Sequence, residues 1–159
     1  MASKGKPFEE AFKEACVKLQ PSVSVDRLYD PQGRLKNVRN ICDFIVFKYP
    51  NQYYFELKDY ALSRINFKVI SEDQLTGLLK KSQLEHVVAG VIFNFRLHES
   101  AYFVNIQRIY ELMLDGHKSI SVQEAAEIGF LLPGGKKITR FRYDVHSLLS
   151  ALEKEDFKC

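Results

Sequence analysis

The stretch that decides the fold is Tyr53-Tyr54-Phe55-Glu56-Leu57-Lys58, together with Ile41-Cys42-Asp43-Phe44-Ile45-Val46 upstream of it. We expect both stretches to be strands, at about 41–47 and 52–58. Side chains two positions apart on a strand share a face, so Glu56 and Lys58 should point the same way while the residues between them point into a core. A carboxylate and an ammonium group should therefore lie side by side.

The segment Lys48-Tyr49-Pro50-Asn51 predicts how the two strands pair. As a four-residue hairpin loop it would place Asp43 opposite Glu56, beside Lys58. Two carboxylates can hold a divalent cation, and a lysine can act on a water molecule. These groups are the minimum that a metal-dependent phosphodiesterase requires.

Length and composition limit the class of protein. A chain of 159 residues, 46% of them hydrophobic and 13% aromatic, fits a single globular domain over 1–159 and excludes wholesale disorder. Its formal charge is only +3, so binding to nucleic acid must depend on where the 23 Lys and Arg residues lie.

Cysteine spacing and hydropathy indicate the cellular compartment that we expect for the protein. Cys16, Cys42 and Cys159 are scattered, without the C-x-x-C spacing of a zinc or redox site, and we interpret them as structural thiols. The first residues lack the apolar run of a signal peptide, and no stretch is long and apolar enough for a membrane span. We expect a cytoplasmic protein with no membrane association.

The rest of the chain alternates helical and strand patterns. The predicted elements are a helix that begins near Pro7, a short strand at 23–28, an extension of the sheet at 65–70, a helix capped by Ser71, a strand at 87–95 buried on both faces, its hairpin partner at 101–106, a helix at 107–114 and a short helix from 121 to 128. The segment Gly134-Gly135-Lys136-Lys137 lacks the spacing of a phosphate-binding loop and is interpreted as a turn with a basic edge. This order predicts an α/β fold with a mixed central sheet flanked by helices.

Several of these features together resemble one nuclease family. They are Gly5-Lys6-Pro7-Phe8-Glu9-Glu10 in the first helix, Asp43 thirteen residues before Glu56, the Glu56-Leu57-Lys58 core, Gln74 in the next helix, and the segments around Gly90, Tyr102 and Lys118. The chain resembles the RecU-type Holliday-junction resolvases of the PD-(D/E)XK nuclease superfamily, over most of its length. The resemblance implies a restriction-endonuclease-like fold.

The resemblance also implies roles for particular residues. Asp43 and Glu56 would be magnesium ligands, with Mn²⁺ able to substitute, and Lys58 would be the catalytic lysine. Gln74 would lie in or beside the metal shell, and Glu9 would support the site from the first helix. A backbone carbonyl such as that of Leu57 and water molecules would complete the oxygen ligands.

Several of these residues also have an interpretation without a catalytic or metal-binding role. Glu56 and Lys58 alone could be solvent-facing residues of an edge strand, but Asp43 lies in an apolar strand where an unpaired charge is costly unless a cation satisfies it. Gln74 stands where a capping box places its return arm, and Glu9 could be an ordinary first-turn acid.

Basic residues concentrate just before Asp43 and are candidates for contacts with DNA phosphates: Arg27, Arg34, Lys36 and Arg39. A solvated charged connector is the plainer interpretation. The family carries a longer basic stalk here, of which only about 30–40 is present, and a hydroxyl residue and a proline where this chain has Ile41 and Cys42. The chain is therefore similar to a compact variant, of the kind a phage could encode.

Three functions follow from these expectations. The first is a magnesium-dependent endonuclease of DNA recombination and repair that resolves Holliday junctions, with branched DNA as substrate and a recombinase as a partner. Because paired nicking needs two sites and one chain offers one, it would act as a homodimer. The alternatives are a PD-(D/E)XK nuclease with another DNA preference, and a non-cleaving DNA-binding or recombination-partner module of the same fold.

Overall fold

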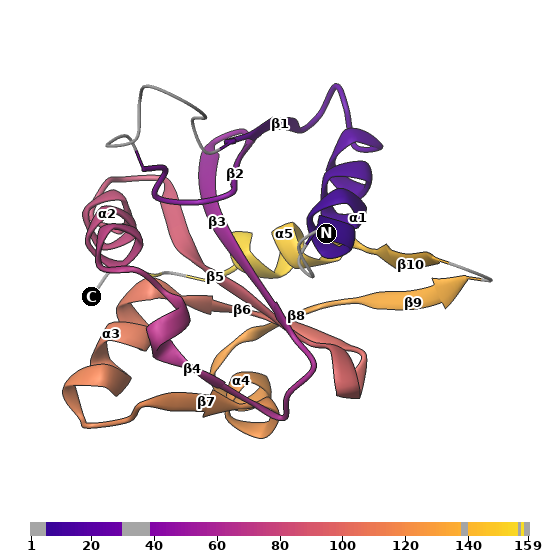
Figure 1. The fold of residues 1–159 in the computed structure, drawn as a ribbon. Helices are drawn as coiled ribbons and strands as arrows, with labels where there is room; N and C mark the ends of the chain where they lie inside the picture. Colours follow the sequence, from indigo (N-terminus) through magenta and orange to yellow (C-terminus); the bar gives the residue numbers. More distant parts are fainter. Residues whose placement is uncertain (1–5, 30–38, 138–139, 156, 158–159) are drawn as a thin grey trace, which may run out of the picture.

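The computed structural model describes residues 6–29, 39–137, 140–155 and 157. A six-stranded mixed sheet divides the molecule into two layers (Figure 1). In spatial order its strands are β1 (Ser24–Arg27), β2 (Phe44–Lys48), β3 (Asn51–Tyr60), β5 (Val87–Phe95), β6 (Ser100–Asn105) and β8 (Phe130–Leu132). Only β3 and β5 pair in parallel, and the other neighbours are antiparallel. The predicted α/β class is confirmed.

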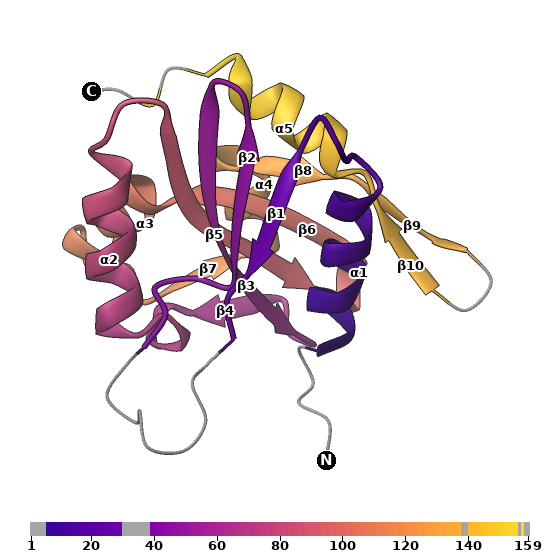
Figure 2. The ribbon, with the colours of Figure 1, turned by 90° about the horizontal axis from the view of Figure 1, so that it is seen from above.

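Helices cover both faces of the sheet, as Figures 1 and 2 show. One face packs against α1 (Lys6–Val17) and α5 (Val145–Glu153), and the other against α2 (Glu72–Ser82), α3 (Ile106–Leu114) and α4 (Val122–Ile128). Each face has its own apolar core, and β5 is buried along almost its whole length because it contributes to both. The prediction of a doubly covered strand is confirmed.

The β2–β3 hairpin has the predicted register. Phe44 pairs with Phe55, so Asp43, one residue before the strand, comes opposite Glu56, and its N–H donates to the Phe55 carbonyl at 3.1 Å. The loop is shorter than expected, because Lys48 and Asn51 also pair and leave two residues at the turn. The correction leaves the alignment of the acids unchanged.

Two small strand pairs flank the main sheet, and each corrects an expectation. The 65–70 segment does not extend the sheet, because β4 (Arg64–Asn66) pairs with β7 (Ser119–Ser121) and a 3-10 turn follows at Phe67–Val69. The expected basic turn is instead the strand β9 (Gly134–Lys137), which pairs with β10 (Arg140–Tyr143). Figure 2 shows this hairpin extending past α1.

The helices begin largely where their capping residues indicate. Ser71 and Ser121 each form a complete capping box, with Gln74 and Glu124 respectively. The sequence interpretation missed α5, although its cap was visible: the Asp144 side chain accepts from the Ser147 N–H at 3.0 Å. No helix within the described residues is long and apolar enough to cross a membrane.

Candidate active site

The candidate site lies where β3 runs past the end of β2. The β2 ladder stops at Phe44, so the last part of β3 has an open edge on that side. A cavity of about 290 Å³ opens there, lined by Glu9, Asp43 and the β3 residues from Glu56 to Tyr60. The sequence placed Glu9, Asp43, Glu56 and Lys58 in one site, and the structure brings all four to this cavity.

Asp43 closes the open edge. Its Oδ2 accepts from the Leu57 N–H at 2.8 Å, taking the place of the next ladder bond. A strand residue directs its N–H and C=O toward the same neighbour, so the Leu57 carbonyl also points to this edge. Leu57 therefore offers a backbone oxygen beside the Asp43 carboxylate while its side chain packs in the core.

Glu56 is buried, with only 3% of its surface exposed. Its Oε1 receives two partners, Lys58 Nζ at 2.8 Å and Gln74 Nε2 at 2.8 Å. Its Oε2 is buried without a hydrogen-bond partner, and within the described part of the chain it is the one side-chain atom in that condition. An ionised oxygen in that position is costly unless a cation or a proton satisfies it.

The electrostatics of the two acids agree with this geometry. Burial, followed by the charge of Asp43, raises the pKa of Glu56 to about 8 despite the opposing Lys58 ammonium. Burial raises the pKa of Asp43 to about 6, while its bond from the Leu57 N–H opposes the shift. Two carboxyl groups with raised pKa values at one open edge form a site that binds either protons or a cation.

Helix α2 places Gln74 against the site. The Gln74 side chain uses its two ends at once, since Oε1 accepts from the Ser71 N–H at 3.0 Å while Nε2 donates to Glu56. The capping and site roles thus coexist. Close by, a Cβ on Gly77 would lie 2.2 Å from Ile41 Cγ2, so only glycine lets the segment before Asp43 approach the helix this closely.

Helix α1 contributes Glu9, which is held by an arginine. Arg27 on β1 makes ion pairs with Glu9 and Glu10, and its side chain is 9% exposed. Its guanidinium also lies over the Tyr29 ring, at 4.8 Å from the centroid. The structure therefore gives Arg27 a place inside the protein that fixes Glu9, and leaves little of it to meet the expected DNA phosphates.

The other expected DNA contacts are placed unevenly. Arg39 is exposed and lies 3.8 Å from an Asp73 carboxylate oxygen at the start of α2. Arg34 and Lys36 lie outside the described residues, as does Cys159. Cys16 and Cys42 are buried free thiols, and burial raises their pKa to about 12, which agrees with structural roles.

Side chains alone supply only some of the oxygen ligands that a magnesium ion would need at this site. No group of three or more His, Cys, Asp and Glu side chains among the described residues could hold a metal by itself. Magnesium ordinarily binds one or two carboxylates and keeps several waters, so such a group is not required. Asp43, the unpartnered Oε2 of Glu56 and the Leu57 carbonyl supply oxygen donors of the kind it takes.

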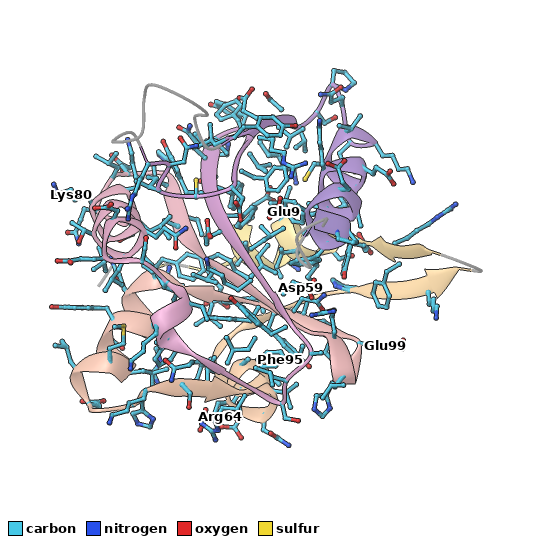
Figure 3. The ribbon with its side chains drawn as sticks, viewed as in Figure 1. Glu9, Asp59, Arg64, Lys80, Phe95 and Glu99 are labelled. Atoms are coloured by element: carbon cyan, nitrogen blue, oxygen red, sulfur yellow. The ribbon has the colours of Figure 1, made fainter. Side chains whose placement is uncertain are left out.

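Asp59 is a buried acid beside the site that the sequence interpretation did not single out. Its side chain is 4% exposed, and its Oδ1 accepts from Asn94 Nδ2 at 3.0 Å and Arg96 Nε at 2.9 Å. Figure 3 shows Asp59 and Glu9 on the α1 side of the molecule, far from Lys80 on α2. The signal available in the sequence was that Asp59 directly follows Lys58. Its side chain therefore lies on the opposite face of the strand.

The sheet order and the flanking helices form a restriction-endonuclease-like fold. The solved structure of Hjc, a Holliday junction resolvase from the archaeal hyperthermophile Archaeoglobus fulgidus, matches with a TM-score of 0.53 and 14% sequence identity, covering 77% of this chain and 93% of that one. At this identity the likeness shows the fold. No protein-family model and no curated protein matches the sequence.

Proposed function

We propose that this chain is a magnesium-dependent endonuclease that resolves Holliday junctions by paired nicking in a homodimer. The observation that carries the proposal is the buried, unpartnered Oε2 of Glu56 beside Asp43, at an edge where Lys58 also lies. The restriction-endonuclease-like fold, shared with an archaeal resolvase, supports it. We extend to this chain the RecU-type roles of these residues.

When bound, a magnesium ion would supply a Lewis acid for the scissile phosphate and would favour hydroxide. Asp43 and Glu56 would hold the ion through carboxylate oxygens, and the Leu57 carbonyl would add a backbone ligand. Lys58 stays beside the reacting phosphate because Glu56 Oε1 fixes its ammonium at 2.8 Å. There it orients the attacking water and offsets the charge that develops on the phosphate.

Two supporting residues keep Glu56 in place. Gln74 donates to the same oxygen of Glu56 as Lys58, which leaves the other, unpartnered oxygen to bind an ion. Glu9, held by Arg27, lines the cavity from the opposite side. Arg39 is exposed near the start of α2 and is proposed to contact DNA phosphates, together with Arg34 and Lys36.

The proposal predicts cutting that depends on both the ion and the acids. A synthetic four-way junction should be cut in Mg²⁺ or Mn²⁺ and left intact in EDTA, and a linear duplex of the same sequence should be cut far more slowly. Glu56→Gln and Asp43→Asn should lower the cutting rate about 100-fold or more and retain binding. Gel separation of end-labelled strands measures the rates.

The substitutions are chosen to preserve the fold. An asparagine at 43 can still accept from the Leu57 N–H, and a glutamine at 56 removes a buried charge. Glu111→Gln, in an exposed ion pair on α3, is the matched control and should cut normally. Normal cutting by Asp43→Asn or Glu56→Gln would overturn the metal assignment.

The same assay distinguishes the two alternatives. Equal cutting of junction and duplex would favour a PD-(D/E)XK nuclease with another DNA preference, for which the short 30–40 connector is the motivating feature. Binding without any cutting would favour the non-cleaving module. The complete set of Asp43, Glu56 and Lys58 at one cavity argues against that last alternative.

A further inference from the structure

A second, larger hollow adjoins the candidate active site on the α1 face of the sheet. Its volume is about 580 Å³, and it lies between α1, the ends of β3 and β5, and the β9–β10 hairpin. Asp59 lines both this hollow and the candidate active site. Because Asp59 lines both cavities, a ligand in the hollow would lie next to the candidate active site.

Aromatic rings form one wall of the hollow. Phe8 meets Tyr143 edge to face at a centroid distance of 5.2 Å, and Phe141 lies 5.0 Å from Tyr143. A Cβ on Gly134, across the hairpin, would lie 2.5 Å from the Phe141 ring, so the glycine makes room for these rings. Such a wall suits a flat, apolar-faced ligand.

The floor of the hollow is polar and buried. The hydrogen bonds and the ion pair described for Asp59 all use Oδ1, which leaves Oδ2 to accept from a ligand. Asn94, 7% exposed, lies beside it and retains its amide oxygen as a further acceptor. The floor therefore favours a ligand that presents N–H donors.

The charge of the lining disfavours a phosphate as the occupant. Four acids line the hollow against two basic residues: Glu10, Glu14, Asp59 and Glu99 against Arg96 and Lys136. An anion would be repelled, whereas a neutral ring with amino or imino groups would not. Among the parts of DNA, only a nucleobase combines a flat face, N–H donors and no charge.

We propose that this hollow receives one nucleobase, turned out of the DNA stack next to the phosphate that is cut. This inference rests on the proposed function, which brings a DNA backbone to Lys58. Phe141 and Tyr143 would stack on the extruded base, and Asp59 and Asn94 would accept from its edge, as enzymes that extrude bases do. Nucleotides at a branch point have fewer stacking partners to lose.

The test combines removal of the base with removal of the ring. Four-way junctions would carry a stable abasic nucleotide at each position near the branch in turn, and binding would be measured in EDTA. For the unaltered chain, one position on each cut strand should lower affinity about tenfold. Phe141→Leu, which keeps an apolar side chain and removes the ring, should bind the intact junction about tenfold less tightly and show no further loss at that position.

Two more variants keep the test decisive if Phe141→Leu folds poorly. Ala11→Phe fills the hollow from α1. Like Phe141→Leu, it should bind the intact junction less tightly and show no further loss at the sensitive abasic position. Tyr110→Leu makes the same ring removal on the exposed part of α3, outside the hollow, and should retain the tenfold abasic effect. Thermal unfolding of each variant would confirm its fold.

The outcomes separate this inference from the proposed function. The base site is overturned if an abasic nucleotide lowers affinity equally in the unaltered chain and in both hollow variants. It is also overturned if no abasic position lowers the affinity of the unaltered chain, even if the junction is cut. If Phe141→Leu and Ala11→Phe abolish the abasic effect but no metal-dependent cutting is seen, the base site is supported and the proposed nuclease function is overturned. A chain that binds no branched DNA would overturn both.

Discussion

At the residue scale, Glu56 shows what the sequence determines and what it does not. Its alignment with Asp43 followed from strand alternation and a hairpin, both of which are local properties. Its burial, and the use of one oxygen by both Lys58 and Gln74, depend on α2, which packs against β5 and brings Gln74 to the Glu56 side chain. The sequence therefore predicted that Asp43, Glu56 and Lys58 lie together, whereas the unpartnered oxygen needed the structure.

The raised pKa values predict how stability depends on pH. Glu56 and Asp43 have pKa values of about 8 and about 6 when folded, above the values near 4 of an unfolded chain. The folded state therefore binds protons more tightly, and without divalent ions its stability is greatest below pH 4 to 5 as far as these two groups determine it. That contribution is lost progressively as the pH rises toward about 8.

Melting temperatures measured in EDTA from pH 5 to pH 8 test this linkage. Glu56→Gln should melt about 3 °C or more above the unaltered chain at pH 8, with a smaller difference at pH 5. Adding Mg²⁺ at pH 8 should stabilise the unaltered chain and have little effect on Glu56→Gln. Glu111→Gln should follow the unaltered chain throughout, and a Glu56→Gln variant that is less stable at pH 8 would contradict the assignment of Glu56 as a destabilising buried acid.

Arg27 marks the limit of inference from charge patterns. As one of four basic residues before Asp43, it looked like a contact for phosphates. The structure pairs it with Glu9 and Glu10, which lie seventeen to eighteen residues earlier on α1. A pairing between separate elements leaves no local signal, so the sequence could not distinguish an inward arginine from an outward one.

At the element scale, the predicted parts are those with local signals. The capping boxes of α2 and α4 and the apolar run of β5 were read directly from sequence. The pairing of the 65–70 segment was not predicted, because β4 pairs with β7, which lies more than fifty residues later in the chain. The short strand β9 was missed because Gly134–Lys137 shows no alternation of polar and apolar residues, whereas β10 was missed although Arg140–Tyr143 alternates basic and aromatic residues.

Helix α2 gives a matched pair of variants, since α4 carries the same capping box. Gln74→Ala and Glu124→Ala should each lose one cap and about 1 kcal/mol of stability. Only Gln74→Ala also frees Glu56, because Glu124 lies in an exposed ion pair with Arg64. Junction cutting should therefore fall about tenfold in Gln74→Ala and stay normal in Glu124→Ala.

Initial rates at saturating DNA, together with melting temperatures, separate the two effects. Equal losses of cutting in both variants would mean that Gln74 acts only as a cap. Unchanged cutting in Gln74→Ala would remove it from the site altogether.

At the scale of the whole molecule, each chain presents one candidate active site, at one end of its sheet. The structural match covers 93% of the archaeal resolvase chain, so nearly all of that fold has a counterpart here. Resolution of a four-way junction needs two cuts related by symmetry. The proposed function therefore requires two chains on one DNA, each supplying its own Asp43, Glu56 and Lys58.

Mixed dimers test this requirement. Chains with two different tags, one unaltered and one carrying Glu56→Gln, would be produced together, and the species that bears both tags purified. On a supercoiled plasmid with a cruciform, the unaltered dimer should make paired nicks and give linear DNA, whereas the mixed dimer should nick one strand and give open circles. A mixed dimer of the unaltered chain with Glu111→Gln should give linear DNA, since Glu111 lies away from the site on α3. Linear DNA from the Glu56→Gln mixed dimer at the normal rate would mean that one chain makes both cuts, and a single chain that sediments alone while it cuts would exclude the homodimer.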